Sequence, residues 1–252
     1  MLTIKKAVLI SFFITLLIFL SNFLQSSSQI TKTKAFVIKV IDGDTLELSN
    51  GIKVRLLGIN APEEGEAFFD EARNYLSELV ENKEVYLEED IIKKDIYGRK
   101  LAFVFVNGKN VNVEILKKGL AHTFDLNKIS KYLDELKDAE KYAIRNEIGI
   151  WKKSNITCIS LDSLIFVGEE KVVLKNNCNF SIQLKNWVLE DESHNKFIFP
   201  SYIFNPGEKI EIFSTNLSQK FSFKKKYPIW NKEGDSLFLR DSSGSLVLFY
   251  RY

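Results

Sequence analysis

The sequence predicts a mixed architecture: a small β-barrel with helices, followed by an all-β sandwich. Short alternating strands surround a helical segment up to about residue 152, and from about residue 157 the helical period disappears. The composition is that of folded protein, since 45% of the 252 residues are hydrophobic and 27% are charged. The net charge is +2, and neither half is strongly basic: Lys and Arg number 19 against 22 Asp and Glu in 34–152, and 13 against 11 in 153–252, so any nucleic-acid contact must come from local clusters.

The hydrophobic pattern of the first half predicts five strands and three helices. The strands are expected at 36–41, 45–48, 52–59, 84–88 and 101–106, and the helices at 66–81, 111–119 and 130–147. Asn50-Gly51 supplies a hairpin turn, and Gly119 and Gly149 stand where helices end. This order suits an OB-fold, a barrel that commonly binds oligonucleotides on one face.

The second half predicts a β-sandwich of seven short strands separated by turn signals such as Asn205-Pro206-Gly207. The strands are expected at 161–167, 171–174, 187–189, 197–199, 210–213, 237–239 and 246–250. Trp151, Trp187 and Trp230 are expected to be core anchors.

Residues 1–29 are typical of an export signal. Lys5 and Lys6 precede an apolar run from 7 to 20, and a polar stretch follows. The run reaches the lower length limit of a membrane span, so the segment is either cleaved or kept as an anchor. The lysines place the rest of the chain outside the cytoplasm, secreted or anchored to the membrane.

The chain has two cysteines, Cys158 and Cys178, at the start of the second half. An oxidising compartment would allow one disulfide between them. A zinc site is not expected, because His122 and His194 are not at ligand spacing from a Cys or from each other. Both histidines are expected to be ordinary surface or half-buried residues.

Three segments of the first half carry residues suited to phosphoryl chemistry. The turn 42–45 (Asp-Gly-Asp-Thr) is by itself a common hairpin, but 55–63 and 95–99 add arginines and further oxygen ligands. A hard divalent ion needs carboxylate and carbonyl oxygens, a phosphate needs planar donors, and water needs a carboxylate to orient it. These three requirements are met by Asp44, Asn60, Glu63, Arg55 and Arg99.

The blocks 40–45, 55–63, 95–99 and 119–121 with the closing 149–151 resemble the thermonuclease, or staphylococcal nuclease, domain, and we place that domain at 34–153. The resemblance implies an OB-fold and a calcium-dependent nuclease that hydrolyses DNA or RNA to products with 3′-phosphate ends. It also implies residue roles: Asp44 and the Ala61 carbonyl as calcium ligands, Glu63 as general base, Arg55 and Arg99 as phosphate clamps, and Tyr97 as a nucleotide contact.

Asn60 departs from the family pattern, which has a second calcium-binding Asp at this position. An amide oxygen can still ligate calcium, but one negative charge is lost, so weaker calcium binding is expected, on the order of 0.1–1 mM. The alternative is a catalytically inactive domain, serving as a nucleic-acid-binding or envelope-adhesion module. Arg55, Glu63 and Arg99 argue against it, because an inactive copy has no reason to keep all three.

Residues 157–252 resemble, more loosely, the lamin tail domain, an immunoglobulin-like β-sandwich. The resemblance is carried by the segments 184–189, 199–200, 206–208 and 234–244. It implies an accessory role: this domain would attach the protein to an envelope component or hold nucleic acid. We expect the chain to be a monomer.

Overall fold

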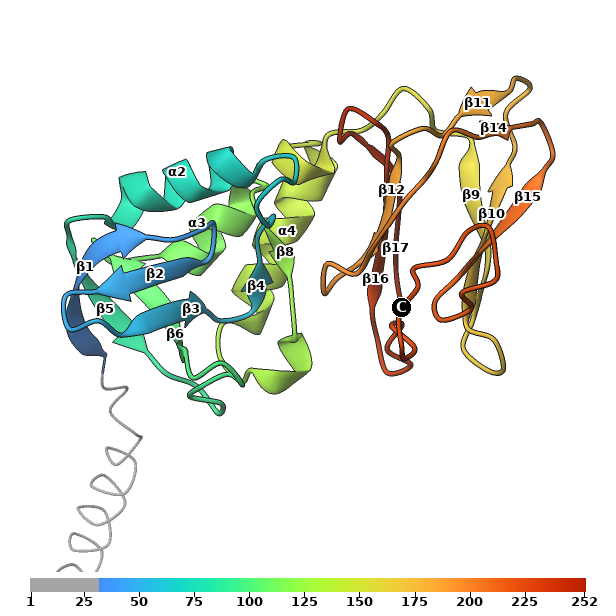
Figure 1. Cartoon of the computed structure of the whole chain (residues 1–252). Helices are drawn as coiled ribbons and strands as arrows, with labels where there is room; N and C mark the ends of the chain where they lie inside the picture. The colour runs from blue at the N-terminus through green and yellow to red at the C-terminus, as the bar shows by residue number, and fades with distance from the viewer. Residues whose placement is uncertain (1–31) are drawn as a thin grey trace, which may run out of the picture. The chain divides into compact units, whose positions relative to one another are not determined.

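The computed structural model describes residues 32–252, and its first elements form a barrel (Figure 1). The barrel strands are β1 Thr33–Val40, β2 Thr45–Leu48, β3 Lys53–Leu56, β5 Glu84–Glu88, β6 Lys100–Val106 and β7 Lys109–Asn110. They follow the order β3-β2-β1-β5-β6-β7, and β3 also pairs with β6 in parallel. This extra pairing closes five strands into a barrel and confirms the predicted OB-type fold.

The helices of the barrel domain are α2 Phe69–Val80, α3 Val111–Lys117 and α4 Leu133–Arg145, with short 3-10 turns η1 Leu126–Lys128 and η2 Gly149–Trp151. Helix α2 begins three residues later than predicted because Phe68 is left-handed, with φ of 69°. Helix α4 also begins three residues late, because Tyr132 has φ of 59°. A helix cannot continue through a residue of that conformation.

The strand predicted at 52–59 is divided in two. Gly58 has a φ of 74°, which turns the chain out of the barrel after β3. The next two residues form β4 Ile59–Asn60, which pairs antiparallel with β8 His122–Thr123. This division places Asn60 opposite His122 instead of in the barrel wall.

Gly119 follows the end of α3 as predicted, but α4 ends at Arg145, and the left-handed residue after it is Glu147, with φ of 53°. Gly149 instead begins η2, where it contacts Gly119. A Cβ built on Gly119 would lie 2.1 Å from the Ile148 carbonyl oxygen, and one on Gly149 would lie 2.1 Å from the Gly119 carbonyl oxygen. The Ile150 N–H donates to the Gly119 carbonyl at 2.8 Å. The end of α3 and the start of η2 therefore meet backbone to backbone, where no side chain fits.

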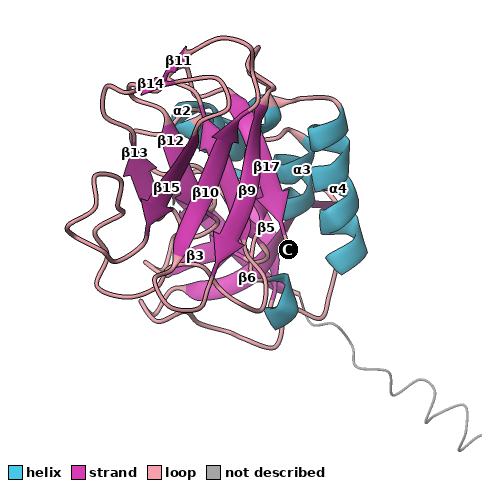
Figure 2. Ribbon diagram, turned by 90° about the vertical axis from the view of Figure 1, so that its right-hand side faces the viewer, coloured by secondary structure: helices cyan, strands magenta, loops and turns pink. Residues whose placement is uncertain are grey.

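The tail domain consists of two sheets, ordered β15-β10-β9 and β13-β12-β16-β17, and a small pair, β11-β14. Figure 2 shows β9, β10 and β15 side by side. The bounds are β9 Ile159–Ile165, β10 Lys171–Asn176, β11 Ile182–Gln183, β12 Val188–Asp191, β13 Lys196–Ile198, β14 Ile203–Phe204, β15 Lys209–Phe213, β16 Ser236–Arg240 and β17 Leu246–Arg251. All seven predicted strands are present. The pair β11 and β14 was missed, because two residues show no alternation.

The core of the tail contains Trp187 and Trp230, each less than 5% exposed, as predicted. A disulfide joins Cys158, just before β9, to Cys178, just after β10, with the Cα atoms 5.1 Å apart. This is the pair expected from the sequence.

Residues 34–252 form one compact unit, in which the tail packs on α4 and η2. Trp151, the third predicted anchor, is 1% exposed and its ring centroid lies 5.0 Å from that of Phe249. The Arg240 Nη1 donates to the Ile150 carbonyl at 2.6 Å. Arg251 forms a bidentate ion pair with Glu140 of α4, in which Nη1 lies 2.5 Å from Oε2 and Nη2 lies 3.1 Å from Oε1.

A second ionic contact joins Glu66, on the loop before α2, to His194 and Lys196 of the tail. The His194 Nδ1 lies 3.0 Å from Glu66 Oε1. Burial raises the pKa of Glu66, but the hydrogen bonds and charges of His194 and Lys196 outweigh it and lower the pKa to about 2. Burial lowers the pKa of His194, but Glu66 outweighs it, and the pKa is raised above its ordinary value of 6.5.

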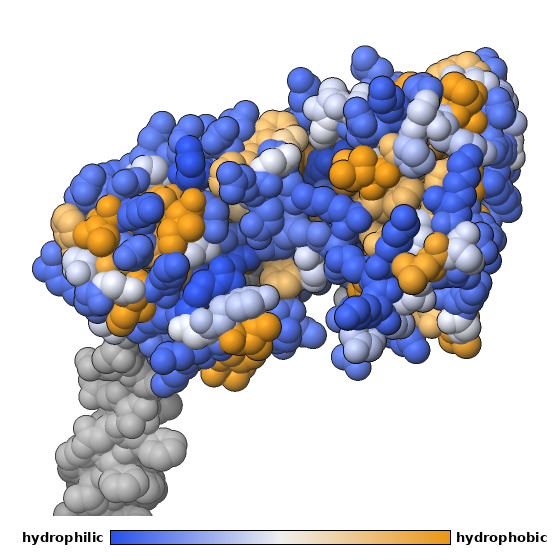
Figure 3. Space-filling model, in the orientation of Figure 1, coloured by the Kyte–Doolittle hydropathy of each residue, from blue (hydrophilic) through white to orange (hydrophobic). Residues whose placement is uncertain are grey.

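The face in Figure 3 is mainly hydrophilic, with apolar residues in separate patches. Within residues 32–252, none of the helices is long and apolar enough to span a membrane. The predicted export segment at 1–29 lies outside the described residues.

Reducing the disulfide should loosen the tail. The bond closes a loop with a sequence separation of 20, and on the chain-entropy model such a loop contributes roughly 3 kcal/mol. We expect urea denaturation of the Cys158→Ser, Cys178→Ser double variant to give a free energy of unfolding lower by about that amount, with a steeper slope because its unfolded chain is less compact. Two reactive thiols in the non-reduced protein would contradict the bond.

The pair of Glu66 and His194 should make stability depend on pH. The contribution of Glu66 is present above 4.5 and is lost as the pH falls toward about 2, because its folded pKa is lowered. That of His194 is present below 6.5 and is lost as the pH rises through its raised folded pKa. His194→Gln should therefore lower the melting temperature most between pH 4.5 and 6.5.

His122 provides the control, because burial lowers its pKa to about 3. A histidine with a lowered folded pKa costs stability as the pH falls below 6.5. The stability difference between wild type and His122→Gln should therefore become less favourable to wild type as the pH falls from 6.5 toward 3, whereas the difference for His194→Gln should grow as the pH falls toward 6.5 and stay level from there down to 4.5. If the stability differences from wild type showed the same dependence on pH for both variants, the assignment to His194 would be refuted.

Candidate functional site

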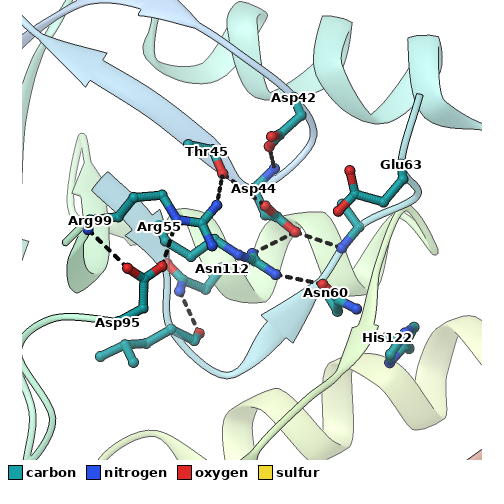
Figure 4. A network of polar contacts seen from close by, with 12 residues as sticks. Asp42, Asp44, Thr45, Arg55, Asn60, Glu63, Asp95, Arg99, Asn112 and His122 are labelled. Carbon is teal, nitrogen blue, oxygen red and sulfur yellow. Dashed lines mark hydrogen bonds and ion pairs between the residues drawn. The ribbon is translucent and has the colours of Figure 1, made fainter. Parts of the chain in front are cut away.

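The polar network in Figure 4 is centred on Arg55 of β3. Its Nη2 donates to Asn60 Oδ1 at 2.5 Å, and its Nη1 lies 2.5 Å from Asp44 Oδ2. The second contact is an ion pair and not an aligned hydrogen bond, since Nη1 has no acceptor in line with its N–H bonds. The Arg55 side chain is only 12% exposed, so one buried guanidinium joins two of the predicted metal ligands.

Asp44 follows the turn between β1 and β2, where it is 5% exposed. Asp42 Oδ1 accepts the Asp44 N–H at 3.0 Å and fixes the turn, and Asp44 Oδ2 accepts the Ala61 N–H at 2.7 Å. Burial raises the pKa of the Asp44 carboxyl to about 7, against the opposing effects of Arg55 and the Ala61 N–H. This carboxylate therefore lies where more positive charge would stabilise its ionised form.

Gly43 allows this turn to approach its neighbours closely. A Cβ at position 43 would lie 2.6 Å from the Cβ atoms of Ala61 and Ala72. The turn therefore packs directly on the segment after β4 and on α2, and any side chain here would push Asp44 away from Arg55.

Arg99 reaches the same network from the segment before β6. Its Nε donates to Asp95 Oδ2 at 2.6 Å, and its Nη1 lies 3.4 Å from Thr45 Oγ1. Asp95 Oδ1 also accepts the backbone N–H groups of Tyr97 and Arg99 at 2.9 Å each. The loop is thus fixed by Asp95, and the guanidinium lies next to the Asp44-Thr45 turn.

The other predicted site residues lie at the edge of the network. Glu63 is exposed on the loop after β4, and its backbone N–H donates to Glu66 Oε2 at 2.9 Å. Figure 4 shows its carboxylate on the side where Asp44 lies. Tyr97 is 78% exposed, with its ring 5.5 Å from the Arg99 guanidinium carbon. The Ala61 N–H contacts Asp44, while the role of its carbonyl stays a prediction.

A cavity of about 130 Å³ adjoins the two arginines. Its polar wall contains Arg55, Asp95 and Arg99, and its apolar wall contains Leu57, Ile92, Phe124 and Ile129. A small planar group could enter beside the two guanidinium groups.

Sequence reasoning missed two supporting residues. Asn112 is fully buried, where its Nδ2 donates to the Leu57 carbonyl at 2.8 Å and its Oδ1 accepts from Val104 N–H at 3.1 Å. It holds the chain between Arg55 and Asn60. The sequence feature that could have identified it is a polar residue between two valines, Val111 and Val113. The other is Asp95, whose signal was its place four residues before Arg99.

His122 was expected at the surface or half-buried, but it is 6% exposed. The expectation was wrong because β8 pairs with β4 beneath the tail, which sequence spacing does not reveal. Its Nδ1 lies 3.0 Å from the Thr123 carbonyl oxygen, and since a carbonyl only accepts, this nitrogen carries the proton.

A second group of possible ligands, Glu66, Glu190 and His194, has its ligand atoms within 4.8 Å of one another. Lys196 pairs with Glu66 and Arg240 with Glu190. The carboxylates there are already balanced by cations of the chain. At Asp44 and Asn60, a carboxylate and a neutral amide oxygen from two segments share a single guanidinium, and such oxygens suit a hard divalent ion.

Comparisons with known proteins match both halves. The family model described as Staphylococcal nuclease homologue matches residues 53–153, and that of the Lamin Tail Domain matches 146–252. The nuclease model begins after Asp44, but the structure places β1 and β2 in the same barrel as β3.

Several curated relatives align with about half of the chain. An uncharacterized endonuclease of Haemophilus influenzae is 38% identical over 128 residues, which cover 49% of this chain and 69% of that protein. The thermonuclease of Staphylococcus intermedius is 31% identical over 140 residues, 52% of this chain and 83% of that protein. A micrococcal nuclease of Shigella flexneri is 32% identical over 136 residues, 47% of this chain and 74% of that protein.

The barrel, the converging arginines and these relatives lead to one conclusion. The chain belongs to the staphylococcal nuclease family of endonuclease-type hydrolases, and a lamin tail domain follows its nuclease domain.

Proposed function

We propose that the protein is an exported, calcium-dependent nuclease that cleaves DNA or RNA and leaves 3′-phosphate ends. The observation that carries this proposal is the contact of Arg55 with both Asp44 and Asn60, beside Arg99. It brings two arginines and several oxygen ligands from distant segments to one point. This combination is suited to stabilising the charge that develops on a phosphodiester during hydrolysis.

The donor set fits calcium. Asp44 supplies a buried carboxylate and Asn60 an amide oxygen, and a backbone carbonyl of Ala61 would complete the protein's share, because calcium prefers oxygen ligands. The raised pKa of Asp44 points the same way, since a bound cation would offset its burial. Calcium held there would supply positive charge next to an oxygen of the bound phosphate.

Arg55 and Arg99 would hold the phosphate. Arg55 is fixed by its two partners in the network, and Arg99 by Asp95, so neither needs to reorganise as charge develops on the phosphate oxygens. The planar guanidinium of arginine matches phosphate oxygens better than the ammonium of lysine does.

Glu63 would accept the proton of the attacking water. Its position on an exposed loop leaves the carboxylate accessible to solvent. The water oxygen then bonds to phosphorus, the bond to the 5′ oxygen breaks and that oxygen takes a proton from solvent, and the phosphate stays on the 3′ side. Tyr97 is exposed next to Arg99, where it could contact the nucleotide.

Export is proposed from residues 1–29, whose lysines and apolar run are typical of a signal or anchor. The protein would act outside the cytoplasm as a monomer, secreted or held at the membrane. The tail would contact an envelope component or the nucleic acid.

The experiment is cleavage of single-stranded and double-stranded DNA and of RNA by the purified chain, with calcium and with a calcium chelator. We expect cleavage that needs calcium, and end-labelling should show 3′-phosphates. Binding of the same substrates without cleavage would instead support the inactive alternative.

Arg99→Ala should lower the turnover number about 100- to 1,000-fold, the usual cost of losing one donor to developing charge. Folding should be kept, because Asp95 still accepts the two backbone N–H groups that fix the loop. Arg99→Lys should restore only part of the activity.

Arg73→Ala is the matched control, since Arg73 pairs with Asp70 on the exposed side of α2. Its activity should equal that of wild type. Near-normal turnover by Arg99→Ala would refute the role of Arg99.

A further inference from the structure

The Asn60 side chain is hydrogen-bonded on both sides, once within the nuclease domain and once to the tail. Its Oδ1 accepts from Arg55 Nη2 at 2.5 Å, and its Nδ2 donates to the backbone carbonyl of Glu192 at 2.8 Å. A guanidinium only donates and a carbonyl only accepts, so the two partners settle which atom of the amide is oxygen. The tail therefore determines the direction in which this oxygen points.

The Glu192 carbonyl lies in a hydrogen-bonded turn between β12 and β13. Asp191 is 2% exposed, and its Oδ1 accepts the N–H groups of Ser193 and Asn195 at 2.9 and 2.8 Å. Its Oδ2 accepts the Asn195 side-chain amide at 2.6 Å. Asp191 thus fixes the turn from inside the tail.

A separate set of contacts fixes the tail against the strand pair that carries Asn60. Arg251 of β17 binds Glu140 of α4, whose two carboxylate oxygens also accept the backbone N–H and the hydroxyl of Thr123 at 2.7 and 3.0 Å. Thr123 is in β8, next to β4. Ionic contacts elsewhere therefore hold the tail against this strand pair in addition to the hydrogen bond between Asn60 and Glu192.

An aspartate at position 60 could not make both contacts. An ionised carboxylate accepts hydrogen bonds but donates none, so one of its oxygens would face the Glu192 carbonyl oxygen without a proton between them. An unpaired buried acceptor is costly. The amide suits a site that has a guanidinium on one side and a carbonyl on the other.

We propose that the tail domain is a positioning part of the nuclease site: the Glu192 carbonyl holds the Asn60 amide with its oxygen toward Arg55 and Asp44, and this contact explains the amide at position 60. The proposal rests on the proposed function, because it assigns that oxygen to calcium. It gives the tail a role inside the nuclease domain, separate from any external partner.

The test is calcium binding by the full chain, measured by calorimetry. Asp191→Ala loosens the turn without touching the nuclease domain, and it should weaken calcium binding about tenfold, the lower end for losing a group that orients a ligand. Asp191→Asn keeps an acceptor for the turn and should recover most of the affinity.

Asp241→Ala is the matched control. Asp241 caps the turn between β16 and β17 in the same way, and its Oδ1 accepts the N–H groups of Ser243 and Ser245 at 2.9 and 3.1 Å. That turn does not contact Asn60, so calcium affinity should stay within about twofold of wild type. Melting temperatures of all variants separate loss of stability from loss of affinity.

The Asn60→Asp variant provides the second part of the calcium-binding test. Its carboxylate makes no hydrogen bond to the Glu192 carbonyl, so adding Asp191→Ala to this variant should not weaken calcium binding. Equal affinity losses for Asp191→Ala in both backgrounds, or equal losses for Asp191→Ala and Asp241→Ala, would overturn the proposal.

A measurement on wild type alone covers the case in which a variant fails to fold. The side-chain amide protons of Asn60 should exchange slowly with solvent in the calcium-free protein, and fast exchange would refute the contact. Absence of calcium binding by a wild-type protein with protected amide protons would remove the proposed function but keep the positioning contact.

Discussion

The nuclease site depends on one buried guanidinium. Arg55 is in β3, inside the barrel wall, while Asp44 follows a turn and Asn60 is in a strand outside the wall. Its contacts with both hold these segments together. Burying this arginine would be costly without them, because an unpaired charge loses its hydration. The same contacts therefore stabilise the fold around the candidate site and bring the side-chain oxygens of Asp44 and Asn60 together.

Much of the fold could be predicted because its patterns are local. The alternation of strands, the helical period and the glycine after α3 depend on neighbours in the sequence. Local patterns could not reveal where Phe68 and Tyr132 would adopt left-handed conformations, so two helix starts were misplaced. Nor could they divide the strand at Gly58, because the pairing of β4 with β8 depends on residues sixty positions away.

The candidate site shows the same limit. Asp44, Arg55, Asn60 and Ala61 were expected together, and the structure brings them into direct contact. The contact of Asn60 with Glu192 crosses 132 positions and uses a backbone carbonyl, which every residue has. Nothing in the identity of residue 192 marks it, so only the folded chain shows why an amide is suitable at position 60.

The meeting of Gly119 and Gly149 has a consequence for recognising distant copies of this domain. These glycines are required by atomic volume, whatever the domain does, because any Cβ would overlap a carbonyl oxygen. A copy that has lost catalytic activity would still need these glycines in order to fold, whereas its arginines and Glu63 could be replaced by other residues. In a distant sequence, the glycine pair therefore indicates the architecture, and the charged residues indicate whether it still works as an enzyme.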